Sequence, residues 1–452
     1  MTTTTAHRLR ATASGTDIMS SKDHLTWRVE SGTRAKPIIV AVMFLEDRLP
    51  WEQFVAWHGH LCAGMPRMQA RVHEPPTAFR RPHWAPDPDF RLEHHLHHIT
   101  VGGKGTRRDV LDTAATLAEI PFCQNRPPWN GYLIDGLDDG RSAYMLKISH
   151  SIADGVRLRE MFLRQAAAQQ PAPPTAPPAA TGPATASERR IARPVGMARR
   201  LRKAAQFAAQ ALTDIRDRPY PVPPKKTRFA RRYYTTKVPT APFKDVAVAG
   251  GGTVHDALVA AVAHGCHRYH RARGIQRPRL RVFSPYARPP LTGRRPFAPM
   301  GNHWFIVRFT LRADQPDARR RISEVRTAVQ GAYHRDAADW MGAVARISPL
   351  LPLRWFETGF LRLCASHDFG ISNMPGPRTP LSVGGVRAQE IYAIAPVMGF
   401  AVAVTLLSYR DHCHVTVNID PDVIADPDLL AQHIHDSLGD LATTAEHHPG
   451  RT

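Results

Sequence analysis

Two apolar patterns near the N-terminus predict a strand followed by a helix. Residues 37–45 form a short apolar run, which is typical of a buried strand. Residues 51–72 carry apolar side chains at helical spacing and are expected to form one helix; the apolar positions are Phe54, Val55, Leu61, Met65 and Met68. A strand followed by a helix indicates an α/β or mixed α+β domain.

A second strand and helix flank the heptapeptide SHSIADG at residues 149–155. Residues 142–148 alternate so that one face of a strand carries Tyr144, Leu146 and Ile148. The next apolar positions repeat at helical spacing and are Leu158, Met161, Phe162 and Ala166. The heptapeptide is therefore expected to be the turn that joins this strand to this helix.

A proline-rich stretch predicts how the chain divides. Residues 171–184 read PAPPTAPPAATGPA, with six prolines and no charge, so the stretch is expected to be an extended linker. The expected parts are a disordered tail (1–13), an N-terminal lobe with the heptapeptide (14–170), the linker (171–195), and a basic helix with a C-terminal lobe (196–452). Both lobes have the size of ordinary domains.

Positive charge is concentrated just beyond this linker. The formal net charge is +21, and residues 189–232 hold fourteen Lys and Arg against Asp214 and Asp217. Such a segment suits a phosphate-bearing partner: coenzyme A, anionic lipid or nucleic acid. Within it, residues 197–212 predict a weakly amphipathic helix with a mostly alanine apolar face, which either lies on a membrane or packs on the protein.

Cysteine usage and apolar run length predict where the protein works. The five cysteines are widely spaced and odd in number, unlike a secreted disulfide framework, so a reducing compartment is expected. The N-terminus lacks the apolar core of a signal peptide, and the apolar runs 38–45 and 393–407 are too short or too interrupted to span a bilayer. A cytoplasmic protein is expected, either soluble or peripheral at a membrane or lipid-droplet surface.

The heptapeptide carries the residue types of a general base on a rigid turn. A histidine at the end of a strand is held by ordered backbone, and a neutral imidazole titrates near working pH, so His150 suits proton abstraction from an alcohol. Asp154 stands where a helix N-cap belongs, with Gly155 after it. The alternative is purely structural: a cap and a tight turn beside one of 24 histidines.

The heptapeptide and its surroundings resemble the bacterial wax ester synthase/acyl-CoA:diacylglycerol acyltransferase family. That family carries the signature HHxxxDG, which SHSIADG matches at all defined positions but the first. Other segments resemble the family in the expected order: WAPDPDF (84–90), PFCQNRPPW (121–129), residues 135–137, residues 253–263, Gly301-Asn302, SNMPGP (372–377) and LSY (407–409). The resemblance covers nearly the whole chain apart from the tail, the linker and the basic segment.

The resemblance implies a fold of two chloramphenicol-acetyltransferase-like lobes with an active-site tunnel between them. It implies that His150 deprotonates the acceptor hydroxyl, which attacks the acyl-CoA thioester directly. Asp154 is then expected to pair with an arginine and hold the turn, together with Gly155. The further residues it suggests for substrate binding are Ser149, Trp129, Asn302, Ser372 and Asn373. The last three are candidate oxyanion donors, although turn chemistry explains them equally well.

Three departures from the family pattern bear on the substrate. Ser149 replaces the first motif histidine, Pro128 replaces a leucine, and His255 replaces the asparagine before Asp256. The expected activity is acyl-CoA-dependent esterification of diacylglycerol or a long-chain alcohol, giving triacylglycerol or wax ester, with acyl-CoA as a substrate and no cofactor. The alternatives are a lipid- or acyl-CoA-binding paralogue that has lost the chemistry, and an acyltransferase for a non-lipid hydroxyl or amine.

Other functional motifs are weak or missing in this sequence. The histidine-rich segments 93–98 and 264–270 lack the spacing of HExxH or of paired CxxC motifs, so no metal site is expected. The sequence has no GxSxG elbow, P-loop or dinucleotide fingerprint. Nucleic-acid binding would rest on charge alone, and no such partner is expected.

Overall fold

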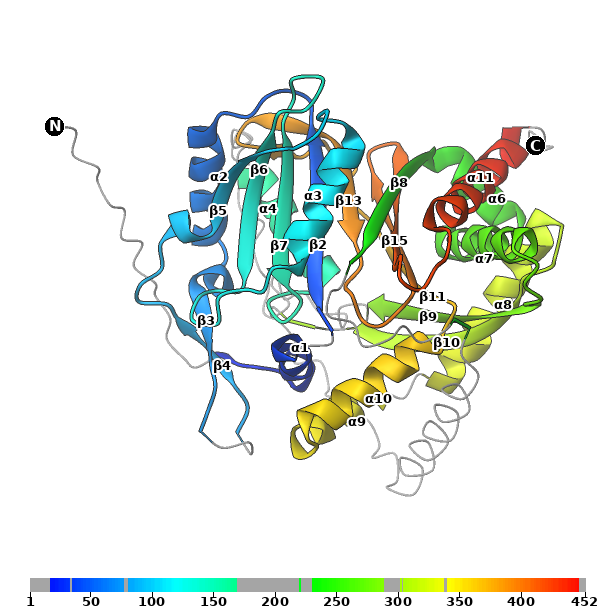
Figure 1. The fold of residues 1–452 in the computed structure, drawn as a ribbon, viewed down its shortest axis with the longest axis horizontal. Helices are drawn as coiled ribbons and strands as arrows, with labels where there is room; N and C mark the ends of the chain where they lie inside the picture. The colour runs from blue at the N-terminus through cyan, green and yellow to red at the C-terminus, as the bar shows by residue number, and fades with distance from the viewer. Residues whose placement is uncertain are drawn as a thin grey trace, which may run out of the picture.

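The computed structural model describes residues 17–32, 35–76, 80–168, 219–220, 230–287, 301–302, 304–336 and 340–446. Two six-stranded mixed sheets form the centres of two lobes that lie side by side (Figure 1). A small three-stranded sheet in the order β1-β4-β3 flanks the first lobe; its strands are Asp17–Ile18, His83–Pro86 and Ala70–His73. The predicted tail, linker and basic helix fall outside the described residues.

The sheet of the first lobe has helices on both faces. Its order is β12 (Ser382–Val383), β13 (Val386–Ile394), β2 (Ile38–Leu45), β7 (Ala143–Ser149), β6 (Trp129–Asp135), β5 (Leu96–Thr100). Alternate β2 residues such as Val40 and Val42 pack with α3 (Arg107–Glu119). Ile39 and Met43 pack with α2 (Trp51–Ala63) and α4 (Gly155–Ala168) on the other face. Because helices cover both faces of this sheet, every residue of β2 is apolar.

The helix predicted over residues 51–72 is shorter than expected. α2 ends at Ala63, and a 3-10 turn (Pro66–Gln69) leads into strand β3. Met65 is extended, with φ −137° and ψ 90°, because the proline ring that follows disfavours the helical conformation at this position. Pro66 also lacks the N–H that would continue the helix. The apolar residues beyond the proline still pack in the core, and they do so from a different element.

The second lobe is built on the other large sheet. Its order is β10 (Trp304–Arg312), β9 (Arg279–Ala287), β11 (Phe369–Met374), β14 (Val402–Tyr409), β15 (His412–Ile419), β8 (Arg232–Pro239). One face packs on α6 (Thr240–Ala249), α7 (Val254–Ala272), α8 (Ala318–Asp336) and α11 (Pro427–Glu446). No single helix among the described residues has the length and apolarity of a membrane span; α6 and α7 reach that limit only as a pair bent by 90°.

The two lobes exchange elements. Strand β13, from the C-terminal half, pairs antiparallel with β2 of the first sheet, and the orange β13 lies beside the blue β2 in Figure 1. At the other end, α1 (Ser21–Ser31) packs against α9 (Trp340–Ile347) and α10 (Leu353–Ala365) of the second lobe. The chain therefore crosses between the two sheets three times, and the turn that follows β7 lies where the lobes meet.

Candidate active site

The heptapeptide forms the turn between β7 and α4, as its sequence predicts. Strand β7 ends at Ser149 and α4 begins at Gly155. The backbone N–H of His150 donates to the carbonyl of Pro37 (3.0 Å), which fixes the turn to the start of β2. The N–H of Ile152 donates to the carbonyl of Ser149 (3.1 Å) and closes the turn. His150 is thus held by backbone on both sides.

Asp154 caps helix α4. The backbone N–H of Arg157 donates to Oδ1 of Asp154 (3.0 Å), the bond that an N-cap residue makes with the third residue of a helix. The carboxylate is 6% exposed and lines the cavity beside His150. Asp154 therefore supplies both a cap and a negative charge close to the imidazole.

The imidazole of His150 is held neutral at the edge of a cavity. Burial lowers the pKa of His150, and the charge of Asp154 opposes this shift. Nδ1 is buried without a hydrogen-bond partner, and the ring meets the indole of Trp304 edge-on, with centroids 6.3 Å apart. His150 lines the cavity, so its ring borders the space in which a substrate would lie. A neutral, accessible imidazole nitrogen is what a general base requires.

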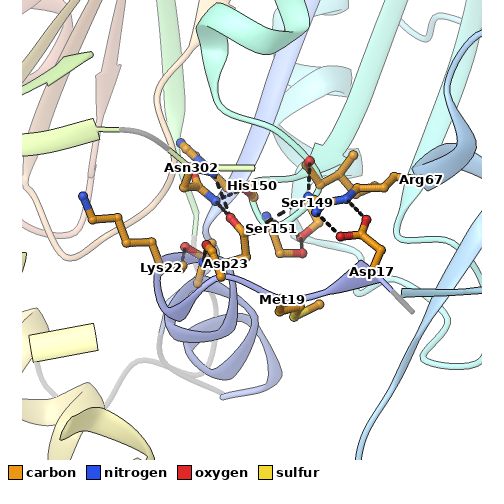
Figure 2. Close-up of polar contacts among 12 residues, drawn as sticks. Asp17, Met19, Lys22, Asp23, Arg67, Ser149, His150, Ser151 and Asn302 are labelled. Carbon is orange, nitrogen blue, oxygen red and sulfur yellow. Dashed lines mark hydrogen bonds and ion pairs between the residues drawn. The ribbon is translucent and has the colours of Figure 1, made fainter. Parts of the chain in front are cut away.

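Asn302 holds the backbone of His150 rather than the substrate. Its side-chain N–H groups donate to the carbonyl of His150 (2.7 Å) and to Oδ1 of Asp23 (2.9 Å), while its oxygen accepts from the Trp304 indole (2.8 Å). Its backbone N–H also donates to Asp23 (2.8 Å). All of its donors are therefore engaged, and none is left for an oxyanion. Figure 2 shows Asn302 reaching the catalytic turn from the second lobe.

Asp23 and Arg67 extend this support beneath the turn (Figure 2). Asp23, on α1, is 1% exposed, and its burial raises its pKa although Arg67 lies 3.6 Å away. Arg67 also binds Asp17 through two nitrogens and donates to the carbonyl of Ile152 (3.3 Å). Gly301 has φ +118°, and a Cβ there would lie 2.6 Å from the Asp23 carboxylate, so this position requires glycine. Sequence reasoning missed Asp23 and Arg67, since neither lies in a family-like segment.

A largely apolar cavity of about 200 Å³ opens in front of His150, between the two lobes. The first lobe contributes Ile39 and the catalytic turn, and β13 contributes Ala393 and Ile394. The second lobe contributes aromatic side chains; they are Phe283, Tyr286, Trp304, Phe360 and Phe400. Such a lining suits an alkyl chain better than a polar ligand.

Three polar side chains from the second lobe also line this cavity. Ser372 and Asn373, on β11, lie in its wall as candidate oxyanion donors, and their side chains make no hydrogen bond within the described part of the chain. Thr405 on β14 faces Ser372 across the sheet; its hydroxyl is buried without a partner, and the residue is 3% exposed. The sequence offered no signal for Thr405, which stands within an apolar run.

Two suggested substrate-binding residues lie away from the cavity lining. The Ser149 hydroxyl donates to the buried Glu30 carboxyl and contacts the Ser151 hydroxyl (2.7 Å). Burial raises the pKa of Glu30 to about 8. Trp129 is fully buried, donates to the carbonyl of Met68 (2.7 Å) and stacks on His95. The side chains of Ser149 and Trp129 both point into the packed first lobe. The structure therefore does not favour direct contact between these residues and a substrate.

The remaining motif residues have structural partners. Asp256 forms a capping box with Thr253 at the start of α7, and His255 stands edge-on to Tyr286, with centroids 5.1 Å apart. In the segment 93–98, His95 bonds to the carbonyl of Trp129. No group of three or more potential metal ligands is found within the described ranges. The basic segment 189–232 lies almost entirely outside them.

Comparisons with known proteins agree with the sequence motifs. The family model for the wax ester synthase/diacylglycerol acyltransferase catalytic domain matches residues 19–258, and that for the C-terminal domain of the same family matches residues 300–442. A putative diacylglycerol O-acyltransferase of Mycobacterium tuberculosis is 26% identical, over 95% of this chain and 92% of the relative. A probable diacylglycerol O-acyltransferase of the same species is 25% identical, over 84% of this chain and 85% of the relative.

Solved structures show the same fold. A wax ester synthase/diacylglycerol acyltransferase from Marinobacter aquaeolei superposes with a TM-score of 0.62 at 19% identity, over 95% of this chain and all of that one. The first condensation domain of the calcium-dependent antibiotic synthetase also has a TM-score of 0.62, at 18% identity, over 95% of this chain and 96% of that one. The expected two-lobed acyltransferase fold is therefore confirmed.

Proposed function

The chain belongs to the wax ester synthase/diacylglycerol acyltransferase family and is an O-acyltransferase, and on this premise we propose that it esterifies a lipid alcohol with acyl-CoA, using His150 as general base. The acceptor is diacylglycerol or a long-chain alcohol, and the product is triacylglycerol or wax ester. The observation that carries the proposal is the position of the His150 imidazole. It is neutral, anchored by its own backbone, and open to an apolar cavity between the lobes.

The proposed reaction is a direct transfer. Nε2 of His150 takes the proton of the acceptor hydroxyl as its oxygen attacks the thioester carbonyl carbon. The tetrahedral intermediate then collapses, the C–S bond breaks, and the imidazolium returns its proton to the leaving thiolate of coenzyme A. A thioester is already activated, so holding the two substrates together supplies much of the rate. No acyl-enzyme and no cofactor enter this scheme.

The developing oxyanion needs a hydrogen-bond donor that is free in the resting site. Asn302 does not meet this condition because its donors are engaged. The Thr405 hydroxyl meets it, since it lines the cavity and has no partner. Ser372 lies beside it on the neighbouring strand. We assign stabilisation of the oxyanion to Thr405 and Ser372.

A lipid acceptor also requires a route from a lipid surface. The turn η3 (Ser348–Leu350) between α9 and α10 exposes Leu350 (68%), and the first turn of α10 exposes Arg354 and Trp355 (67%). Arg28 of α1 donates to the carbonyl of Leu351 (2.9 Å) and holds the turn in place. Exposed tryptophan beside arginine is typical of contact with anionic lipid headgroups. The same helix α10 lines the cavity with Phe360, so this turn is our proposed contact with a lipid surface.

The alternative of a paralogue without activity drew on two departures from the family pattern, Ser149 in place of the first motif histidine and His255 in place of an asparagine. The geometry weakens that reasoning, because position 149 faces Glu30 in the packed interior and not the cavity. The apolar lining likewise disfavours a small polar acceptor. A retained enzyme for lipid alcohols is the function that the site supports best.

The test is ester formation from labelled palmitoyl-CoA with diacylglycerol, hexadecanol, or a short polar alcohol or amine. Wild-type protein should give lipid ester, and His150→Ala should lower kcat by about 10²–10⁴-fold, the usual contribution of a general base. His60→Ala, which replaces an exposed histidine on α2, is the matched control. Equal turnover by His150→Ala and wild type would eliminate the proposed mechanism, and turnover of polar acceptors alone would eliminate the lipid substrate.

A further inference from the structure

A second, smaller cavity lies behind the reaction cavity. Its volume is about 60 Å³, and it lies between the first-lobe sheet and helix α4. The sheet contributes alternate apolar residues of three strands: Ile39, Ala41 and Met43 of β2, Leu146 and Ile148 of β7, and Ile391 and Ala393 of β13. Helix α4 contributes Gly155, Leu158, Arg159 and Phe162. The lining is almost wholly apolar.

The two cavities share a wall. Four residues line both of them, namely Ile39, Gly155, Met374 and Ala393. Three belong to ordered strands or to the start of α4, and their side chains are small or branched. Met374, the last residue of β11, is the one long and unbranched side chain among the four. Methionine changes rotamer easily, so this part of the wall is the part that is able to move.

The methionine lies against the catalytic turn because residue 155 is glycine. A Cβ built on Gly155 would lie 2.1 Å from the Met374 sulfur, which is far inside van der Waals contact. The absence of a side chain at Gly155 therefore makes room for the thioether. Gly155 directly follows Asp154, and both line the reaction cavity together with Met374, so the thioether lies beside the turn that carries His150.

Four residues of α4 line the second cavity, which we call the slot. Gly155, Leu158, Arg159 and Phe162 lie on one face of the helix, at positions i, i+3, i+4 and i+7. These seven steps correspond to about 10 Å of helix. The small volume and the apolar lining suit the end of an alkyl chain better than a polar group.

We propose that this slot receives the distal end of one substrate alkyl chain, and that Met374 controls access to it from the reaction cavity. The inference rests on the proposed function for the chemistry and adds a chain-length determinant to it. The chain in the slot belongs either to the acyl donor or to the alcohol, which share the same chemistry. A change of rotamer that moves the Met374 side chain out of the shared wall opens the passage.

The first experiment measures kcat/KM for two substrate series. In the first series the acyl chain of acyl-CoA varies from about 8 to about 18 carbons and the alcohol is fixed. In the second series the chain length of the alcohol varies and the acyl-CoA is fixed. Chain length changes by roughly one to several methylenes per step in each series. Met374→Ala should raise the preference for long chains in one series only, by up to about fourfold for each added methylene that the slot buries. Met374→Phe should shift the preference to shorter chains. The series that responds identifies which chain occupies the slot.

The matched control is Met145→Ala, because Met145 is a buried methionine of β7 that lines neither cavity. Its chain-length profile should stay that of the wild type. Met374→Leu keeps most of the side-chain volume and replaces Met374→Ala in the assay if the alanine variant unfolds. The proposal is overturned if the Met374 variants turn over with an unchanged profile in both series, or if Met145→Ala shifts the profile equally.

A binding measurement separates this proposal from the proposed function. Calorimetric titration of the acyl-CoA and alcohol series into His150→Ala protein reports chain length without turnover. If the wild type makes no ester but Met374→Ala changes the length dependence of Kd, the slot stands and the proposed reaction fails. If the wild type forms ester and the dependence of Kd on chain length is the same with and without Met374→Ala, the proposed reaction stands and the role of the slot is refuted.

Discussion

Replacing Asn302 by alanine removes three hydrogen bonds beneath the catalytic turn. They are the bond to the carbonyl of His150 (2.7 Å), the bond to the Asp23 carboxylate (2.9 Å), and the bond from the Trp304 indole (2.8 Å). The backbone N–H of residue 302 keeps its bond to Asp23. His150 is then held only by its own N–H and by the ends of β7 and α4.

The expected cost follows from the chemistry of these three bonds. The bond to the charged Asp23 contributes about 1.5–3 kcal/mol, and the two neutral bonds about 1 kcal/mol each. We therefore expect the free energy of unfolding to fall by roughly 4 kcal/mol. A displacement of the imidazole by about 1 Å lowers the rate about 10²-fold, so kcat should fall by that factor. KM for acyl-CoA should change little, because Asn302 does not line the cavity.

The assay pairs ester formation with urea unfolding of each variant. Asp23→Ala removes the other end of the same contact and should lower kcat to a similar extent. The double variant should be little worse than either single one, since the two residues act as one unit. Asn130→Ala is the matched control, because it removes an amide contact to His97 elsewhere in the first lobe.

The competing explanation is that Asn302 itself donates a hydrogen bond to the oxyanion. An oxyanion donor at Asn302 also predicts a loss of 10²–10³-fold in kcat, yet it predicts that Asp23→Ala stays active. Full activity of Asp23→Ala beside an impaired Asn302→Ala would therefore refute the positioning role. Unchanged kcat and unfolding free energy in Asn302→Ala would refute both.

Two further predictions concern pH and lipid binding. Asp154→Asn keeps the helix cap but removes the negative charge that raises the pKa of His150. The acid limb of the profile of kcat/KM against pH should therefore move to lower pH. An acid limb at the wild-type pH, or above it, contradicts the assignment. Trp355→Ser with Arg354→Ser should reduce co-sedimentation with anionic phosphatidylglycerol vesicles at least tenfold, while turnover of a short, water-soluble acyl-CoA stays normal; undiminished binding contradicts the proposed contact.

The local elements around the active site could be predicted from sequence because they depend on neighbours along the chain. Periodicity in residues 142–148 and from Leu158 onward predicted a strand and a helix, and the turn between them carries His150 as expected. The cap at Asp154 was predictable for the same reason. The helix predicted through residue 72 was wrong in length, because one proline outweighed the apolar pattern that continues beyond it.

Roles that depend on distant contacts could not be predicted in this way. Asn302 resembled an oxyanion donor until its donors were found engaged with Asp23 and His150, which lie 279 and 152 residues away along the chain. Trp129 and Ser149 stood beside or within motifs, yet both side chains point into the packed lobe. Thr405 gave no signal, since a threonine in an apolar strand is ordinary until its hydroxyl is buried beside a cavity.

The sequence by itself determined the family and the reaction class, and it singled out His150 as the candidate base, because a histidine on a strand-to-helix turn is encoded in seven consecutive residues. Only the tertiary structure decided which groups hold that histidine and which shape the substrate cavity. The groups that hold it come from α1, from the 3-10 turn Pro66–Gln69 and from the residues just before β10. Those that shape the cavity come mainly from β9, β10, β11, β13, β14 and α10. Side-chain direction and burial at such a junction arise from packing between distant segments, and no local pattern records them.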